Sequence, residues 1–278
     1  MSGGPESKSS FYWGFLFLSK PQRDALGKVY GFCRGMDDIV DSGHLKTGEA
    51  QKLLDFWREE VVRIYADRPT HSLSRQLLPH VHRYRLPQEA FLGVISGVEM
   101  DLRKNRYRTF EELEPYLKGV AVAVGLLCIE IFGYKHTPVE QAREFARHMG
   151  YAFQLTNIIR DVGEDLETGR VYLPVQEIEA AGYSLEALLR REHNEAFVSL
   201  MRRQYERAAG YYRRARNHVH HLDRVSLMPA EMMARVYEEV LERIRLSDFR
   251  VFFARPSVPV WRKAQIAVST WAYCHGIF

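Results

Sequence analysis

The residues of this sequence that could do chemistry are acidic and lie in two short stretches. In the first, NIIRDVGED, an amide and two carboxylates follow one another at four-residue spacing: Asn157, Asp161 and Asp165. Successive residues of an α-helix turn by about 100°, so these three would drift by only about 40° per step and share one face. Three oxygen side chains on one face indicate a site for a hard cation.

The second stretch, RGMDDIVD, carries Asp37, Asp38 and Asp41, with Arg34 and Tyr30 one and two helical turns before them. Carboxylates four residues apart on a helix repel one another by a few tenths of a kcal/mol, about the size of a surface ion pair, and a bound cation would compensate. The alternative is that each stretch is a solvated acidic helix end. Two such stretches, each with apolar flanks and a neighbouring arginine, favour the metal.

A magnesium ion would leave ligand positions for a substrate. Mg²⁺ usually takes one or two carboxylates and fills its other positions with water and substrate phosphate oxygens. Arg34 and Arg160 lie next to the acidic residues and could bind phosphate oxygens through paired N–H groups. A bundle lined by apolar side chains would accommodate an apolar tail. The residues alone therefore predict a Mg²⁺-dependent enzyme that acts on an apolar diphosphate.

Helices must position these stretches, because strand signals are nearly absent and apolar residues recur at three- and four-residue spacing. The fold class is therefore predicted to be all-α. A single domain is expected over residues 1–278, with residues 1–8 disordered and residues 259–278 forming a C-terminal tail or helix. The predicted helices cover residues 21–41, 47–65, 72–84, 87–104, 110–132, 137–165, 184–191, 196–222 and 229–244.

Composition narrows the class of protein. The 39 basic and 35 acidic residues give a net charge of +4, which does not suggest nucleic acid as a partner. Three cysteines without metal-ligand spacing are typical of a reducing compartment, so a cytoplasmic protein is expected. No apolar run approaches the length of about 18 residues that a membrane span needs, so no transmembrane helix is predicted.

Several stretches together resemble the squalene and phytoene synthases, which are head-to-head prenyltransferases. They are SSFYWGFLFL (9–18), VYGFCRGMDDIVD (29–41), MDLRKNRY (100–107), VAVAVGLL (120–127) and QLTNIIRDVGEDLETGRVYLP (154–174). They occur in family order and span most of the chain. The combination of SSFY with FCRxxDDIVD is most similar to the bacterial presqualene diphosphate synthases of hopanoid pathways.

The resemblance implies an isoprenoid-synthase-type helical bundle around a central cavity, with the two acidic stretches facing one another. It assigns metal binding to Asp37, Asp38, Asp41, Asn157, Asp161 and Asp165. It assigns catalysis to Asp37, Asp41, Asp161, Asp165 and Tyr30. It places substrate contacts at Ser10, Phe11, Arg34, Gln154, Arg160, Tyr172, Tyr237 and Arg250. For Tyr172, anchoring of a loop by the ring is the alternative.

The implied reaction joins two farnesyl diphosphates to presqualene diphosphate and releases diphosphate. Two or three Mg²⁺ ions would bind with the substrate diphosphate, and no NADPH is expected for this first half-reaction. The implied partner is farnesyl diphosphate, and a peripheral contact with the inner face of the membrane or handover to downstream hopanoid-pathway enzymes is a further expectation. For the C-terminal tail, packing on the body is favoured over a membrane contact. No nucleic acid is expected.

One position departs from the family pattern. Squalene synthases of higher organisms have a tyrosine where this chain has Gly119, and the chain also lacks a Gly-rich dinucleotide fingerprint. Both features favour a reaction that stops at presqualene diphosphate. The alternatives are a phytoene synthase, which uses two geranylgeranyl diphosphates, a squalene synthase, and a non-catalytic relative that acts in assembly or lipid binding.

Two further features bear on metal binding and on the backbone near the second acidic stretch. His218 and His221 in NHVHHLD would lie near one face of a helix, but a zinc site is disfavoured because no third ligand is evident. Gly163, between two acidic residues, costs a helix up to about 1 kcal/mol relative to alanine. It suggests a close backbone approach or local adaptability, so Gly163→Ala is expected to lower activity more than stability.

Overall fold

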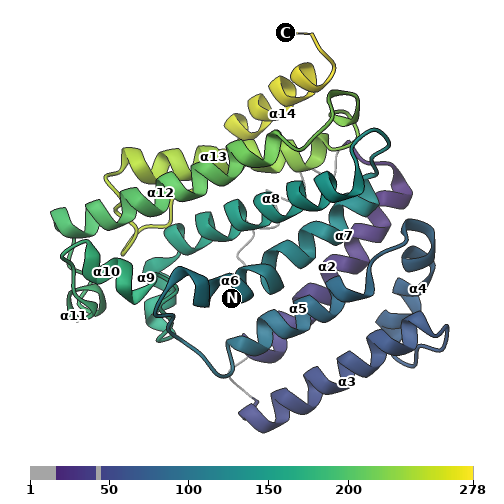
Figure 1. Cartoon of the computed structure of the whole chain (residues 1–278), viewed down its shortest axis with the longest axis horizontal. Coiled ribbons are helices and arrows are strands. Elements are labelled where there is room, and N and C mark those ends of the chain that lie inside the picture. Colours follow the sequence, from purple (N-terminus) through teal and green to yellow (C-terminus); the bar gives the residue numbers. More distant parts are fainter. Residues whose placement is uncertain (1–16, 42–44, 278) are drawn as a thin grey trace.

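The computed structural model describes residues 17–41 and 45–277, which form helices joined by short connections (Figure 1). Over these residues the only β-contact is an isolated bridge between Arg106 and Val171, so the prediction of an all-α protein is confirmed. The helices are α2 (Lys20–Asp41), α3 (Thr47–Tyr65), α4 (Ser72–Tyr84), α5 (Gln88–Met100), α6 (Phe110–Leu117), η1 (Lys118–Val122), α7 (Ala123–Phe132), α8 (Val139–Arg160), α9 (Val162–Glu167), α10 (Val175–Ala180), α11 (Leu185–Leu189), α12 (Glu195–Arg216), η2 (His221–Asp223), α13 (Met228–Leu246) and α14 (Val260–Cys274).

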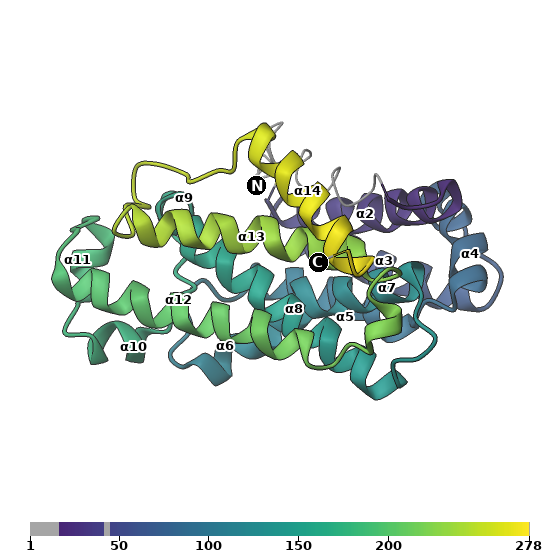
Figure 2. The ribbon, with the colours of Figure 1, turned by 90° about the horizontal axis from the view of Figure 1, so that it is seen from above.

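Helix α8 lies in the middle of the bundle. It packs against α12 and α13 on one side and against η1 and α7 on the other, and α5 follows next (Figures 1 and 2). Helix α2 packs against α4, α5 and α7. Because α2 and α8 both belong to this bundle, the two acidic stretches that they carry are held by the same apolar core.

The centre of the bundle contains backbone-to-backbone contacts at glycines. Helix α6 passes into α7 through η1, a single π-helical turn. A Cβ atom on Gly119 of η1 would lie 2.4 Å from Cα of Gly97 in α5, and one on Gly150 of α8 would lie 2.8 Å from Cα of Val122. Real Cβ atoms do not approach other atoms this closely, so only glycine allows α5, η1 and α8 to pack at these separations.

The second acidic stretch is not on one continuous helix as predicted. Helix α8 ends at Arg160 and α9 begins at Val162, with Asp161 between them at φ −100° and ψ 11°. Helical hydrogen bonds between residues four apart continue across the break. The Asp161 N–H donates to the Asn157 carbonyl and the Asp165 N–H donates to the Asp161 carbonyl, each at 2.8 Å. The regular drift of 40° per step is therefore only an approximation to the arrangement of these side chains.

The segment Phe110–Phe132, which comprises α6, η1 and α7, is long and apolar enough to cross a membrane, and half of its most apolar stretch is buried inside the fold. Its packing against α5 and α8 accounts for the apolar composition.

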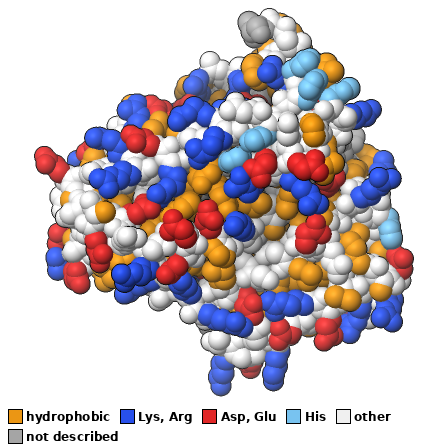
Figure 3. Space-filling view, in the orientation of Figure 1, with side chains coloured by type: hydrophobic (Ala, Val, Ile, Leu, Met, Phe, Trp, Pro, Cys, Tyr) orange, Lys and Arg blue, Asp and Glu red, His pale blue; other side chains and the backbone are white. Residues whose placement is uncertain are grey.

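Helix α14 packs on α13 but leaves Trp261 and Val268 more than 60% exposed. Basic and acidic side chains are interspersed over the face in Figure 3, which agrees with the small net charge.

Predicted helix 196–222 ends early, at Arg216, because the residues that follow are fixed by a buried carboxylate. Asp223, 2% exposed, accepts hydrogen bonds from the backbone N–H groups of Lys135, His136 and Thr137, at 2.9, 2.9 and 2.6 Å. The Thr137 hydroxyl also donates to it, at 2.8 Å. Burial alone would raise the pKa of Asp223, but these hydrogen bonds outweigh it and hold the pKa at about 2.

Asp223→Asn is expected to lower the free energy of unfolding by about 2 kcal/mol near pH 7, from the difference between the ordinary pKa of 3.8 and about 2. Because the folded-state pKa is depressed, this stabilisation is complete above pH 4 and is lost as the pH falls from about 4 to about 2. Urea unfolding of wild type and variant at a series of pH values measures it. Asp24→Asn, at an exposed carboxylate, is the control; a difference for Asp223→Asn that does not shrink in acid would contradict this account.

Candidate active site

The first acidic stretch occupies the last two turns of α2. The Arg34 guanidinium lies 3.0 Å from Asp38 Oδ1, and both side chains are more than one third exposed. Tyr30 is 41% exposed on the same helix. Asp41, the last residue of α2, receives an ion pair from Arg170, whose Nη2 lies 2.8 Å from Asp41 Oδ1. Since Arg170 follows α9 in the chain, this ion pair connects the first acidic stretch to the second.

The second acidic stretch begins with an amide whose oxygen is left unused. Asn157 Nδ2 donates to Gln154 Oε1 at 3.3 Å. Asn157 Oδ1 is buried and has no hydrogen-bond partner within the described part of the chain. A buried oxygen without a partner is costly. An amide oxygen is also a good ligand for Mg²⁺, so this atom is where a cation would fit.

Asp161 is the most buried carboxylate of the two acidic stretches, at 6% exposure. Arg160 contacts both of its oxygens, with Nε at 2.7 Å and Nη2 at 2.5 Å. Arg255 contacts the same two oxygens, with Nε at 3.0 Å and Nη2 at 3.2 Å. One carboxylate thus lies between two arginines, which leaves guanidinium charge available for a second anion.

Two further carboxylates are half-buried close by. Burial and the charge of Asp161 raise the pKa of Asp165 to about 8. Burial raises the pKa of Asp101 to about 6, although the Arg170 guanidinium opposes the rise. A raised pKa means that too little positive charge lies nearby to stabilise the ionised carboxylate. A bound divalent cation would provide that charge.

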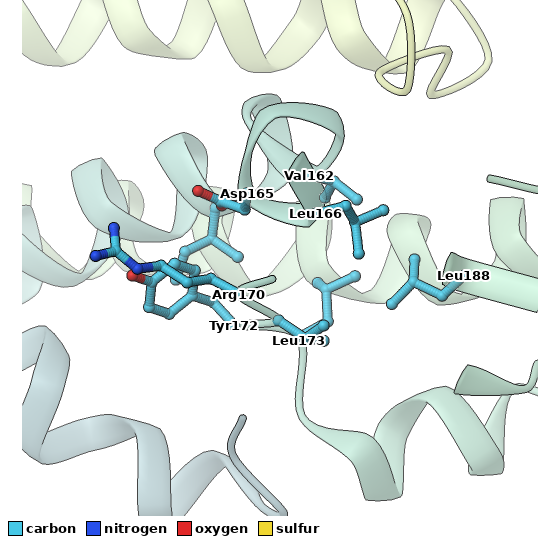
Figure 4. Close-up of a pocket in the computed structure, with 9 residues that line it drawn as sticks. Val162, Asp165, Leu166, Arg170, Tyr172, Leu173 and Leu188 are labelled. Carbon is cyan, nitrogen blue, oxygen red and sulfur yellow. The ribbon is translucent and has the colours of Figure 1, made fainter. Parts of the chain in front are cut away.

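Arg170 and Asp165 also line one side of a small pocket, and Leu166, Leu173 and Leu188 line the other (Figure 4). Tyr172 belongs to the same lining, but its contacts fit the anchoring alternative. Its hydroxyl donates to Asp101 Oδ1 at 2.9 Å, and its ring stacks on Tyr116 at 4.8 Å between centroids.

The other predicted substrate-contacting residues differ in their surroundings. Tyr237 packs its ring on Phe153, with 5.1 Å between centroids, and its hydroxyl lies beside Arg160. Arg250 is exposed, and it is Arg255, five residues later, that reaches Asp161. Ser10 and Phe11 lie outside the described residues.

Sequence reasoning missed Asp101, Arg170 and Arg255. Asp101 and Arg170 lie inside two of the stretches that carry the family resemblance, MDLRKNRY and QLTNIIRDVGEDLETGRVYLP. Their position in those stretches could have identified them as candidate site residues. Arg255 lies in a connection without regular structure before α14, and no local pattern singles it out.

Gly163 is close to the backbone of another segment, as one of the two sequence-based interpretations suggested. A Cβ atom there would lie 2.3 Å from the Phe252 carbonyl oxygen. Gly163→Ala is expected to displace residues 251–255, separate Arg255 from Asp161 and lower turnover at least about tenfold, which corresponds to about 1.4 kcal/mol. The clash adds a stability loss of about 1–3 kcal/mol that the sequence did not predict.

Steady-state turnover and urea unfolding of Gly163→Ala test this expectation. Gly48→Ala in α3, where a Cβ atom would have no neighbour within 4 Å, is the control. Turnover equal to wild type would show that Arg255 does not need this position.

Comparisons with known proteins find relatives that match over most of the chain. A family model described as squalene/phytoene synthase matches residues 5–262. The 15-cis-phytoene synthase of Synechococcus elongatus is 34% identical over 264 residues, which cover 91% of this chain and 85% of that protein. The phytoene synthase of Arthrospira platensis is 33% identical over 264 residues, with the same coverage.

Solved structures give the same fold. Squalene synthase HpnC from Alicyclobacillus acidocaldarius has a TM-score of 0.78 at 28% identity and covers 86% of this chain and 89% of that chain. A dehydrosqualene synthase in complex with a ligand has a TM-score of 0.83 at 24% identity, covers 96% of this chain and 92% of that chain, and supports the fold alone.

Proposed function

Because the chain belongs to the squalene/phytoene synthase family, we propose that it joins two prenyl diphosphates head to head, and that its substrate is farnesyl diphosphate and its product presqualene diphosphate. The observation that carries the proposal is the cluster of carboxylate and amide oxygens at this site. Two acidic stretches from α2 and α8–α9 meet through Arg170, and the site contains a buried amide oxygen without a partner. Such a site offers oxygen ligands for divalent cations, which a polyanionic substrate could share.

The donor set fits Mg²⁺, because it consists of oxygens alone and includes the unused Asn157 Oδ1. We assign the ions to Asp37, Asp38, Asp41, Asn157, Asp161 and Asp165. When bound, two or three Mg²⁺ ions would neutralise the charge on the departing diphosphate.

The arginines would bind and orient the diphosphates. Arg160 and Arg255 both face Asp161, and Arg34 lies on α2 beside the first stretch. In the proposed reaction the allylic C–O bond of one substrate breaks and its electron pair leaves with the diphosphate. The C2–C3 double bond of the second substrate attacks the resulting cation, and loss of one proton closes a cyclopropane ring. Aromatic faces such as Tyr237 and Phe153 would stabilise the cation and exclude water.

Gly119 supports a reaction that stops at presqualene diphosphate. Its backbone contacts Gly97, so no side chain fits at the position where two-step synthases have a tyrosine. Tyr116, one turn earlier, is 5% exposed and stacked on Tyr172. The second candidate is a phytoene synthase that uses geranylgeranyl diphosphate, and the relatives of that name at 33–34% identity favour it.

Incubation with Mg²⁺ and either farnesyl or geranylgeranyl diphosphate, without NADPH, distinguishes these functions. We expect diphosphate release and presqualene diphosphate from the C15 substrate. A C40 hydrocarbon from the C20 substrate would replace the proposal by phytoene synthesis. The absence of diphosphate release with either substrate would favour a non-catalytic relative.

A further inference from the structure

A second group of ligand-type side chains lies where α8 and α12 pack side by side (Figures 1 and 2). Glu144 and His148 are one helical turn apart on α8, and His218 follows the end of α12. One carboxylate oxygen and one imidazole nitrogen from each histidine all lie within 4.8 Å of one another. The sequence-based expectation that His218 would share a helical face with His221 is wrong, because α12 ends before either residue.

His148 supplies an independent sign that a ligand is missing. The residue is 7% exposed, and its Nδ1 has no hydrogen-bond partner among the described residues. This nitrogen lies 4.0 Å from Glu144 Oε2, and the ring stacks on His218 with 5.0 Å between centroids. A buried imidazole nitrogen without a partner is a costly feature that metal coordination would satisfy.

We propose that Glu144, His148 and His218 bind a late first-row dication such as Zn²⁺, at a site separate from the acidic one. Two imidazoles and one carboxylate suit Zn²⁺ and are poor ligands for Mg²⁺. Zn²⁺ binds such atoms at about 2.0–2.2 Å, so a tetrahedral site requires ligand atoms about 3.3 Å apart. Glu144 and His218 are only half-buried and can approach His148 by side-chain rotation. Water would take the fourth position.

Two arginines make the site weaker than an all-histidine site. Arg147 Nε donates to both Glu144 oxygens at 3.1 Å, and Arg214 is close enough to oppose positive charge on His148. The ion must share the Glu144 carboxylate with Arg147. The positive charge of the two arginines repels a bound cation. It therefore disfavours cations that bind by charge alone and favours those that form strong bonds to imidazole nitrogen.

The site lies away from the diphosphate chemistry. His148 and Asn157 are nine residues apart on α8, which corresponds to about 14 Å along the helix axis. An ion there would fasten the middle of α8, whose C-terminal end carries the second acidic stretch, to the end of α12. We therefore expect Zn²⁺ to raise the thermal unfolding temperature of the protein.

Calorimetric titration of the full chain with ZnCl₂, in excess Mg²⁺ so that the acidic site is occupied, tests the proposal. We expect one Zn²⁺ per chain. His218→Ala and Glu144→Gln should each weaken binding at least about tenfold, the lower end of the loss seen when even an outer partner of a metal ligand is removed. His218 is chosen because it is half-buried, whereas loss of the buried His148 could prevent folding.

His221→Ala is the matched control, since His221 lies three residues away, is exposed, and packs its ring against His220 instead. It should bind Zn²⁺ like wild type, and so should Asp161→Asn in the acidic site. The proposal is overturned if wild type binds no Zn²⁺ in excess Mg²⁺, if His218→Ala binds as tightly as wild type, or if His221→Ala loses binding equally. Zinc X-ray absorption on the loaded wild type should show scattering from two imidazoles, and its absence would also overturn the assignment.

Discussion

Asp161→Asn is expected to lower turnover at least about a hundredfold, the loss typical of removing one preorganised charge-stabilising group, and to leave helical content unchanged. The substitution preserves volume but removes the negative charge that lies between Arg160 and Arg255. The two guanidinium groups lose the anion that positions them, and the site loses an oxygen for Mg²⁺. Diphosphate release with each prenyl diphosphate and far-UV circular dichroism measure the two parts of this prediction.

Asp37→Asn is expected to lower turnover to a similar extent as Asp161→Asn, because the first acidic stretch should contribute equally to binding the cations. Asp55→Asn in α3, an exposed carboxylate paired with Arg58, is the control and should retain full turnover. Loss of a buried ionic partner also lowers the free energy of unfolding of Asp161→Asn by about 1–3 kcal/mol. An Asp161→Asn enzyme with near wild-type turnover would remove this residue from the proposed metal site.

Gly119→Ala is expected to destabilise the protein by about 3 kcal/mol, at the upper end of what overpacking costs. The added Cβ atom would lie 2.4 Å from Gly97 Cα, 2.8 Å from Gly97 N and 2.9 Å from the Gly93 carbonyl oxygen. All three are backbone atoms of α5, so no side chain can rotate away, and the helices themselves must separate. Urea unfolding followed by circular dichroism gives the change in the free energy of unfolding.

Gly27→Ala in α2 is the matched control. A Cβ atom there has no neighbour within 4 Å, and the residue is inside a helix. Alanine at such a position should stabilise by about 0.4–1 kcal/mol, because it restricts the unfolded chain. The two substitutions are chemically identical and should have opposite signs. A Gly119→Ala protein as stable as wild type would mean that α5 and η1 do not pack as closely as described.

The features predicted best from the sequence are those that depend on residues close together in the chain. The apolar spacing identified most helices to within a few residues, since a buried face repeats every turn. The two acidic stretches could be found because their spacing is contained within single segments. The break at Asp161 could not be located from the sequence, because Gly163 weakens the helix without fixing where it ends, and hydrogen bonds between residues four apart continue across the break.

Contacts between distant segments were beyond local reasoning. Arg255 reaches Asp161 across 94 residues of chain, and Asp223 fixes the backbone near Thr137 across 86. The sequence pairs His218 with its neighbour His221, whereas the tertiary structure places it against His148. A pattern within one element shows which side chains share a face, but only the packing of helices shows which faces meet.

The contact between Gly97 and Gly119 also constrains how this chain can change over evolutionary time. Each glycine occupies the space that the other's side chain would need, so a mutation at either position alone is unfavourable whatever residue is introduced. Relatives that have a larger residue at one position should therefore show a compensating shift of α5 or of η1. In this chain, a library randomised at both positions and selected for folding should return glycine at each of them far more often than the unselected library does.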